Sequence, residues 1–324
     1  MTSDSASTDV AKGAPEAIKA IPVRHPGRWV AMAVIAVLVA MFVHMLITNP
    51  QFHWSFIWDN LFTPPVLAGA RTTILLTVGA MVVGVVLGII AAVMRLSPNR
   101  VLSTVAFLYT WFFRAVPRLL LCVMFGTAGI LYQHLTLGFP FDKQLGDLFG
   151  LNVDSTILTV DMNTLLSGFM AGLLALGLSE GAYMAEIVRA GILSVGDGQA
   201  EAATALGMSR GLTMRRVVLP QAMRVIVPPT GNEVIAMLKD TSLVAYVPYA
   251  ELFFNYEAIG SRTFQIFPAL IGALLWYLAM SSVLLVIQYF VEKRFSRGRT
   301  VTGTGIRLAF LNRGKPSTVG GADV

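Results

Sequence analysis

The sequence is poor in charged residues and in cysteine, and both deficits restrict what the protein can be. Asp, Glu, Lys and Arg make up only 13% of the 324 residues, whereas hydrophobic residues make up 55%. A soluble globular domain carries about 25% charged residues, so this composition does not suit a water-facing surface. The single cysteine, Cys122, lies in an apolar run, excludes a disulfide within the chain and is interpreted as a buried structural residue. The composition therefore indicates a membrane protein.

The sequence also lacks the motifs of nucleotide and metal chemistry. No Gly-x-x-x-x-Gly-Lys-Ser/Thr loop occurs, because Gly314-Lys315 is followed by proline and Ala309 stands at the position of the first glycine. Neither a His-Glu-x-x-His nor a Gly-x-Ser-x-Gly motif is present, and the four histidines suggest no metal cluster. Basic residues flank apolar runs and are not interleaved with aromatic residues as in a nucleic-acid-binding surface. We therefore expect no catalytic residue, no metal, no bound cofactor and no nucleic-acid partner.

Long apolar runs predict an all-α, polytopic bundle of about six membrane spans, since about 20 apolar residues cross a bilayer. An amphipathic segment at 101–113 precedes the third span, and Gly84 and Gly88 in the second predict tight packing against a helix of the same subunit. Polar tails at 1–28 and 295–324 are expected to be disordered. The predicted spans, apart from the third, are an extra N-terminal helix at 29–48, and then 66–94, 165–192, 225–247 and 267–291.

The distribution of basic residues orients these spans. With both termini in the cytoplasm, 20 of the 24 Lys and Arg residues fall on the cytoplasmic side, against Lys143 and Arg262 in outer loops. Such a bias predicts a multi-pass membrane protein with cytoplasmic N- and C-termini. The loop at 133–164 is rich in aspartate, which places it outside, where its length suits a short helix and contact with an external partner.

A polar stretch at 197–220, the docking loop, interrupts the apolar runs. It predicts a helix from Gln199 to Leu206, begun by Asp197 or Gly198, with Glu201 in its first turn. Gly207 permits the positive φ that ends a helix, and Ser209 caps a second one. Ala202 and Ala203 leave the first helix with little side-chain bulk, so another protein could approach its backbone closely.

Within this loop Gly198, Glu201-Ala202-Ala203, Gly207 and Leu219-Pro220 resemble the "EAA" loop of ABC importer permeases, with Val217 where isoleucine is preferred. The segments 181–192 and 239–243 resemble the polar amino-acid branch of that family, and the similarity covers Leu67 to Arg294. It implies a type I importer fold over 66–294. The segment at 114–121 departs from the family pattern, because Ala115-Val116 replace Gly-Thr, Leu121 replaces Gln, and Arg118 is an extra charge.

The resemblance implies a function and a set of partners. The chain would be the permease subunit that moves a polar or charged amino acid into the cytoplasm. ATPase subunits that bind and hydrolyse ATP would dock on the loop, an extracytoplasmic solute-binding protein would deliver the substrate, and a second permease subunit and membrane lipid would surround the spans. Glu201 would anchor the ATPase, Ala202 and Ala203 would allow close contact, and Gly207 would provide the bend.

Charged residues within the spans are the other candidate site. They are expensive in a membrane and indicate function by default, although they can also simply pair with one another. Glu186 and Arg189 are predicted either to pair or to transmit motion to the docking loop. An ion-gradient-driven secondary transporter, with Glu186, Lys239 and Asp240 as coupling charges, remains the alternative function. The candidates for lining the substrate path are Asn232, Glu233, Lys239, Asp240, Thr241 and Ser242.

Overall fold

The computed structural model describes residues 26–131, 133–138, 157–166, 168–247 and 249–295. Both predicted tails, apart from their innermost residues, and the middle of the acidic loop lie outside the described residues. In chain order the elements are α1 (Pro26–Thr48), η1 (Pro50–Phe52), α2 (Trp54–Asn60), α3 (Pro64–Arg95), α4 (Arg100–Ala115), α5 (Arg118–Leu131), β1 (His134–Leu137), β2 (Leu158–Asp161), α7 (Met162–Leu165), α8 (Gly168–Leu193), α9 (Asp197–Ala205), α10 (Arg210–Thr213), η2 (Met214–Val218), α11 (Leu219–Asp240), η3 (Thr241–Tyr246), α12 (Leu252–Thr263) and α13 (Ile266–Phe295).

The chain divides into two compact units, residues 1–53 and 54–324. The first unit consists of α1 and the short turn η1 that follows it. Apolar side chains are exposed all around α1, including Trp29, Leu38 and Ile47. An apolar helix of this length, with no polar face, is suited to cross a membrane.

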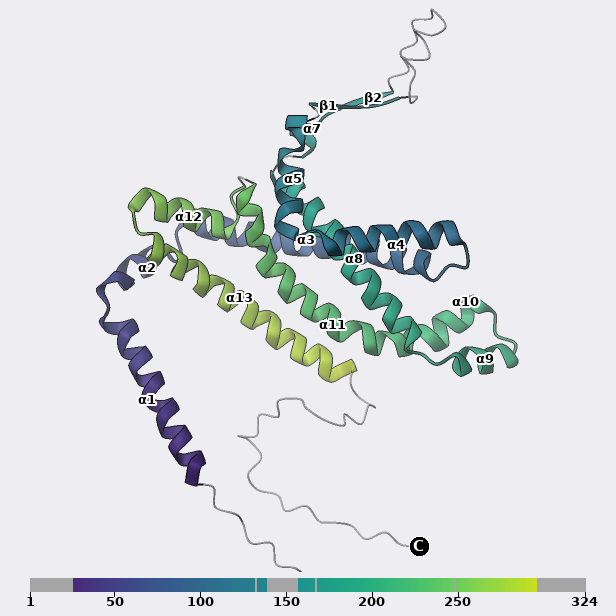
Figure 1. Cartoon of the computed structure of the whole chain (residues 1–324), viewed down its shortest axis with the longest axis horizontal. Coiled ribbons are helices and arrows are strands. Elements are labelled where there is room, and N and C mark those ends of the chain that lie inside the picture. The colour runs from purple at the N-terminus through teal and green to yellow at the C-terminus, as the bar shows by residue number, and fades with distance from the viewer. Residues whose placement is uncertain (1–25, 132, 139–156, 167, 248, 296–324) are drawn as a thin grey trace, which may run out of the picture. The chain divides into compact units, whose positions relative to one another are not determined.

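The core of the second unit is the pairing of α3 with α8, which cross over a long stretch (Figure 1). Two glycines of α3 allow the close approach. A Cβ on Gly84 would lie 3.3 Å from the backbone nitrogen of Gly181, and one on Gly88 would lie 3.0 Å from that of Ala185. The predicted packing of these glycines within one subunit is therefore confirmed.

A sharp bend separates α4 from α5. The two helices are inclined by 101° across Val116 and Pro117, and Val116 is extended, as a residue before proline prefers. Proline begins the turn into α5, because its missing N–H would have no helical partner there. The bend places Arg118, the first residue of α5, against the interior of the bundle.

Helix α11 is continuous where the sequence predicted a break. Pro228 and Pro229 lie inside it, and the change of geometry comes later, at the 3-10 turn η3 that starts at Thr241. Proline keeps a helical φ, but it removes the N–H donated to the carbonyl four residues earlier and its ring crowds that carbonyl, so packing against α8 and α13 must carry the helix through. The prediction of a break at the prolines is therefore wrong.

Four helices of the described part are long and apolar enough to cross a membrane, namely α1, α3, α8 and α13. The bent pair α4 and α5 makes a fifth if it counts as one span. Helix α11 is not among them because of its charged and polar residues, so a count of six requires α11 to cross the bilayer while its polar face is covered by protein. That sixth span stays a prediction.

Glu251 organises the end of the unit formed by α3, α12 and α13. It is fully buried, and as the N-cap of α12 it accepts hydrogen bonds from the backbone N–H of Phe253 and Phe254 at 2.9 and 2.6 Å. Thr73 of α3 and Tyr277 of α13 donate to the same carboxylate at 3.3 and 3.0 Å. Burial raises the pKa of Glu251, and these hydrogen bonds act against that rise.

The described ends of the loop at 133–164, which is predicted to lie outside, form a two-stranded sheet. Strands β1 and β2 pair antiparallel, with His134 opposite Asp161. Asp161 also caps the short helix α7 by accepting from the N–H of Asn163 and Thr164. The predicted short helix is present, while the strands were not predicted from the sequence.

Candidate functional site

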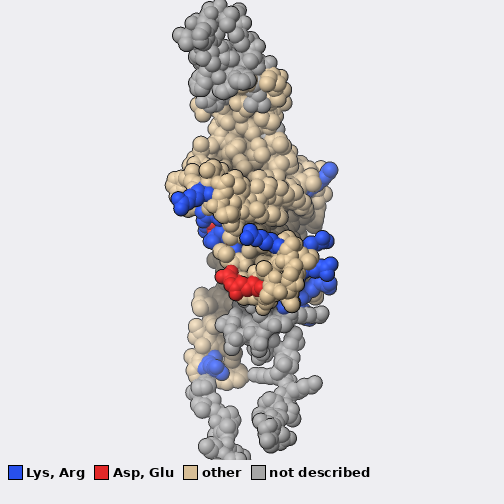
Figure 2. Space-filling view, turned by 90° about the vertical axis from the view of Figure 1, so that its right-hand side faces the viewer, with Lys and Arg blue, Asp and Glu red and all other residues tan. Residues whose placement is uncertain are grey.

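The docking loop forms two short helices at one end of the second unit. It comprises α9, α10 and the π-helical turn η2, which lie beyond the far end of α11 (Figure 1). Helix α9 begins at Asp197, two residues before the predicted start, so Glu201 lies in its second turn and Asp197 is the acidic residue of the first. Figure 2 shows basic side chains on several sides of this end of the molecule and one acidic patch among them.

The backbone of the loop agrees with the prediction at its central residue. Gly207 has a φ of +77° and follows Leu206, the C-cap of α9, and Ser209 is the N-cap of α10, although its side chain makes no capping hydrogen bond. A side chain at Gly207 would be strained, because L residues avoid this region. The predicted bend at Gly207 is confirmed.

The predicted contact residues of the loop do not share one environment. Gly198, Glu201, Ala202, Gly207, Leu219 and Pro220 are exposed. Ala203 is 5% exposed and faces its own chain, so the prediction that it offers a free contact surface is wrong for the isolated subunit. Its methyl group instead allows α9 to pack closely against the rest of the loop.

The loop is joined to α11 without a break in helical structure. The turn η2 runs from Met214 to Val218, and α11 starts at the next residue. A hollow of about 540 Å³ lies in the angle between α9 and this connection, lined by Glu201, Arg210 and Met214 among others. The loop and α11 therefore form one mechanical unit whose outer end carries a concave, partly charged surface.

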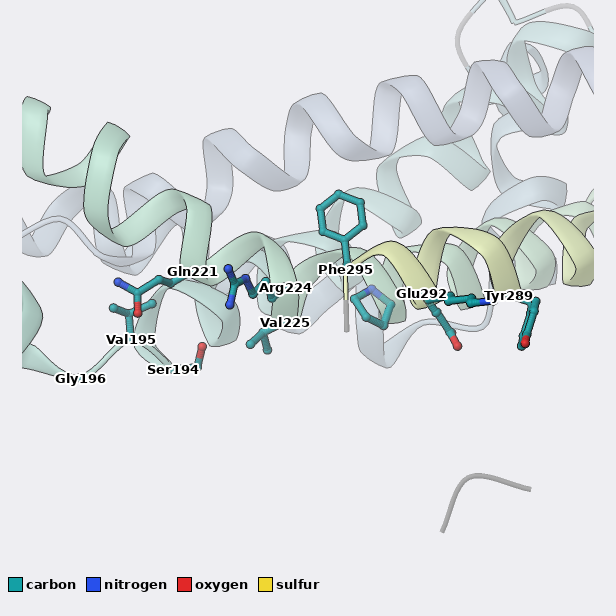
Figure 3. A pocket seen from close by; sticks show the side chains of 11 residues that line it. Ser194, Val195, Gly196, Gln221, Arg224, Val225, Tyr289, Glu292 and Phe295 are labelled. Atoms are coloured by element: carbon teal, nitrogen blue, oxygen red, sulfur yellow. The ribbon is translucent and has the colours of Figure 1, made fainter. Parts of the chain in front are cut away.

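A second hollow, of about 690 Å³, lies at the base of the loop, between the end of α8, the start of α11 and the end of α13 (Figure 3). Its charged and polar lining residues include Gln221 and Arg224 of α11 and Glu292 and Lys293 of α13. It separates the loop from α13 at this point, so the loop joins the bundle through α11 on one side and through residues 194–196, which follow α8, on the other.

Four ionisable side chains meet inside the bundle, far along α11 from the loop. This charge cluster consists of Arg118, Glu180 of α8, and Glu233 and Asp240 of α11. The Arg118 guanidinium donates from Nη2 to Glu180 Oε2 at 2.9 Å and from Nη1 to Asp240 Oδ2, and Glu233 Oε2 lies 3.9 Å from Nη2. Glu233 and Asp240 are seven residues apart, so they lie on one face of α11.

The cluster is deep on one side and open on the other. The Glu180 side chain is 0% exposed, whereas those of Arg118, Glu233 and Asp240 are 13%, 25% and 33% exposed. Within the described residues, Glu180 Oε1 has no hydrogen-bond partner although it is buried. One cation thus faces three carboxyl groups, and the deepest of them has acceptor capacity left.

An aromatic ring completes the surroundings of the arginine. The Arg118 guanidinium lies 4.9 Å from the centroid of the Tyr183 ring, one turn along α8 from Glu180. Arg114 approaches the same ring at 5.6 Å. Carboxylates combined with an aromatic face form a binding site suited to a guanidinium group.

The remaining candidates for the substrate path do not join this cluster. Asn232 accepts a hydrogen bond from Gln288 of α13 at 2.8 Å, and Lys239 is exposed. The hydroxyls of Thr241 and Ser242 donate to carbonyls of their own helical turn. Of the six, Glu233 and Asp240 are brought together, and the suggested pairing of Lys239 with Asp240 is replaced by the pairing of Asp240 with Arg118.

A second ion pair lies near the cytoplasmic end predicted for α8. Arg189 donates from Nε and Nη2 to Glu186 Oε2 at 3.0 and 2.8 Å, which confirms the predicted pair. Arg95, at the end of α3, lies 3.7 Å from the same carboxylate and over the ring of Phe107. The contact of Arg95 with Glu186 therefore also ties α3 to α8.

Sequence reasoning missed Glu180 and gave Arg118 no role. Glu180 lies in the middle of the apolar run at 165–192, and a carboxylate in a membrane span is itself a sufficient signal. The partnership of Arg118 could not be found, because Glu180 and Asp240 are 62 and 122 residues away in the chain.

Comparison with known proteins gives consistent matches over this region. Residues 84–297 match the family described as "Binding-protein-dependent transport system inner membrane component". The chain is 46% identical over 299 residues to the arginine transport system permease protein ArgU of Corynebacterium glutamicum, with 92% of this chain and 89% of the relative covered. It is 34% identical over 244 residues to the L-cystine transport system permease protein TcyB of Bacillus subtilis, with 74% and 92% covered.

A solved structure matches as well. It is described as the crystal structure of an amino acid ABC transporter with histidines, and its TM-score is 0.57 at 31% sequence identity. The match covers 72% of this chain and 94% of that chain. The matched family region contains both the docking loop and the whole charge cluster.

Proposed function

This chain belongs to the family of binding-protein-dependent transport system inner membrane components, as a permease subunit of an amino-acid ABC importer, and from that premise we propose that it carries a cationic amino acid of the arginine class. The resemblance inferred from the "EAA" loop is thereby confirmed, and a secondary transporter is not needed to explain the charges in the spans. The permease is not itself catalytic. The observation that carries the proposed substrate is the convergence of Glu180, Glu233 and Asp240 on one cation-binding point.

The carboxylates account for the charge of the substrate. A guanidinium group matches a carboxylate with two parallel N–H donors, which gives geometric selectivity as well as attraction. Glu233 and Asp240 are partly exposed, so they can meet a solute that enters from the open side of the cluster. The relative with 46% identity is named for arginine transport, which supports the same choice.

The rest of the machinery lies on other chains. The family implies ATPase and solute-binding partners, and we assign ATP binding and hydrolysis to a separate ATPase, with no cofactor held by this chain. The ATPase would contact the exposed residues Gly198, Glu201, Ala202, Gly207, Leu219 and Pro220. We place the chain in a bacterial inner membrane, which its family and relatives support, with both termini and the docking loop in the cytoplasm, which the charge bias of the loops favours.

A second permease subunit and membrane lipid would cover the apolar surfaces. A hollow of about 940 Å³ opens between α3, α8 and α11, and its lining is almost entirely apolar, with Met184, Met223 and Val234 among its residues. Exposed apolar surface of this extent on α3 and α11 suits lipid tails or another helix. We therefore expect the working transporter to hold two permease subunits.

The experiment is uptake of labelled L-arginine into proteoliposomes that contain the chain, its ATPase and a loaded binding protein. We expect uptake that requires ATP and is inhibited by unlabelled arginine more strongly than by citrulline, which lacks the positive charge. The Asp240→Asn variant should lose most of that preference. Glu201→Arg and Gly207→Val should insert normally and lose ATP-driven uptake, whereas the control Gly211→Ala, in α10 with no neighbour within 4 Å of an added Cβ, should keep it.

Two results would count against this proposal. Uptake of glutamate or cystine with no response to arginine would show that the carboxylates do not select the substrate. Uptake that follows an imposed ion gradient and ignores ATP would remove the role given to the docking loop.

A further inference from the structure

The guanidinium of Arg118 is held as a bound ligand would be, and we propose that Arg118 is a tethered competitor of the transported cation. It occupies the carboxylates of Glu180 and Asp240 while the permease is empty and leaves them when a free guanidinium group arrives. Arg118 is thus a residue that sets affinity and specificity from within the chain. The inference rests on the proposed function only for the identity of the competing solute.

The first argument is the composition of the site. Two hydrogen-bonded carboxylates, from different helices, grip the guanidinium from different sides, and the ring of Tyr183 covers it at 4.9 Å. Carboxylates at the edge of the planar group and an aromatic ring at its face are also the contacts by which proteins recognise a free guanidinium ligand.

The second argument is unused capacity. Arg118 supplies one positive charge to three carboxyl groups, and Glu233 stays 3.9 Å away, beyond hydrogen-bond distance. Glu180 Oε1 is buried and, among the described residues, has no partner. An ionised carboxylate offers about four acceptor positions, and leaving a buried one unused is costly. The site therefore has more affinity for cations than Arg118 satisfies.

The third argument is the position of Arg118 in the chain. It is the first residue of α5 and follows the bend at Pro117, so its side chain projects from a helix end and not from a packed helix face. The exposed edges of Glu233 and Asp240 mark the side from which a solute can approach. The long arginine stem lets the head group swing aside without moving α5.

A tethered competitor has a clear use in a transporter. Its effective concentration at the site is in the millimolar range or above. A free cation can bind only to the fraction of molecules in which Arg118 has left the carboxylates, so its apparent dissociation constant is the intrinsic one divided by that fraction. A carrier that bound arginine through these three carboxylates and nothing else would release it slowly. Arg118 supplies the replacement ligand at the moment of release, which also keeps the carboxylates from standing empty in a low-dielectric interior.

Chemical rescue tests the inference on the purified ATPase-bound transporter. Arg118→Ala should lower the thermal unfolding midpoint, and millimolar ethylguanidinium should restore most of that loss. Ethylammonium at the same concentration should restore much less, and urea nothing. The matched control is Arg114→Ala: Arg114 faces the same ring at 5.6 Å but has no ion pair within the described residues, so ethylguanidinium should leave that variant unchanged.

Binding gives a second, independent readout. The dissociation constant for L-arginine, measured without the solute-binding protein, should fall about tenfold in Arg118→Ala, since the internal competitor is gone. Should that variant fail to fold, Arg118→Lys keeps the charge but lacks the two Nη groups that reach Glu180 and Asp240, and arginine should again bind more tightly than to the unmodified chain.

The outcomes separate this inference from the proposed function. Failure of ethylguanidinium to rescue Arg118→Ala, or weaker arginine binding in both variants, would overturn the inference and show that Arg118 is a fixed structural counter-ion. That result would leave ATP-driven arginine uptake by the unmodified chain untouched. Rescue without any arginine uptake would support the guanidinium site and remove the proposed substrate.

Discussion

Arg118 and Glu180 join the bend between α4 and α5 to the middle of α8 through a hydrogen bond of 2.9 Å. The pair explains how a carboxylate survives at the centre of an apolar helix. Glu180 is fully buried beside Gly84 of α3, whose missing side chain makes room for it. A buried charge in that position needs a partner of opposite charge from another element. The bend at Pro117 places Arg118 within hydrogen-bond distance of it.

Removing one partner of the buried pair of Arg118 and Glu180 should destabilise the fold more than removing one partner of a partly exposed ion pair. Glu180→Ala leaves Arg118 with its contacts to α11 and to the Tyr183 ring, and we expect a loss of about 3 kcal/mol, the lower range for a buried pair that loses one partner. The matched control is Glu186→Ala, whose partly exposed pair with Arg189 is worth about 1 kcal/mol or less. Thermal unfolding in detergent measures both, and equal losses would contradict the burial argument.

The positive φ of Gly207 should matter for coupling and little for stability. Gly207→Ala forces an L residue into a left-handed conformation at a cost of about 1 kcal/mol, confined to the turn between α9 and α10. We expect stimulated ATP hydrolysis to fall severalfold while insertion and the unfolding midpoint barely change. Gly211→Ala is the control, and a loss of activity as large in that variant would rule out the backbone explanation.

The close contact of α3 with α8 should not tolerate a side chain at Gly88. A Cβ there would lie 3.0 Å from backbone atoms of Met184 and Ala185, so Gly88→Val must push the two helices apart, at a cost of about 3 kcal/mol or more. The neighbouring substitution Ile89→Val, at a side chain that is 47% exposed, should be nearly neutral. Expression and unfolding in detergent report the difference, and a stable Gly88→Val protein would disprove the packing.

Glu251 should act as a structural latch and not as a transport residue. Glu251→Ala removes the cap of α12 and strands the hydroxyls of Thr73 and Tyr277, which predicts a loss of about 2 kcal/mol or more. Tyr277→Phe removes one of these bonds and should cost about 1 kcal/mol. Arginine affinity should be unchanged in any folded fraction, and a selective loss of binding in Tyr277→Phe would argue against the latch.

The sequence was sufficient for features that depend on neighbouring residues. The helix that ends at Gly207, the Ser209 cap position and the pair of Glu186 with Arg189 all follow from spacings of a few residues, and the structure contains each of them. Helix starts were less exact: α9 begins at Asp197 with Gly196 as its N-cap, whereas the sequence predicted Asp197 or Gly198 at the cap position.

Features that depend on tertiary packing were not predicted. The charge cluster joins residues from three helices, and no local pattern says that Arg118 meets Asp240. The continuity of α11 through Pro228 and Pro229 was missed for the same reason, because proline disfavours a helix locally while contacts with α8 and α13 maintain it. The burial of Ala203 likewise reflects how α9 folds back onto its own chain.

The two prolines in α11 have a consequence for leakage. They lie between the docking loop and Glu233, and neither can donate an N–H to the helical ladder, so the rod is softer there than on either side. A movement of the loop should therefore bend α11 partly at this joint, so that the carboxylates move less than the loop does. We expect this difference to limit the opening of the bundle, and hence leakage, when the loop moves only slightly.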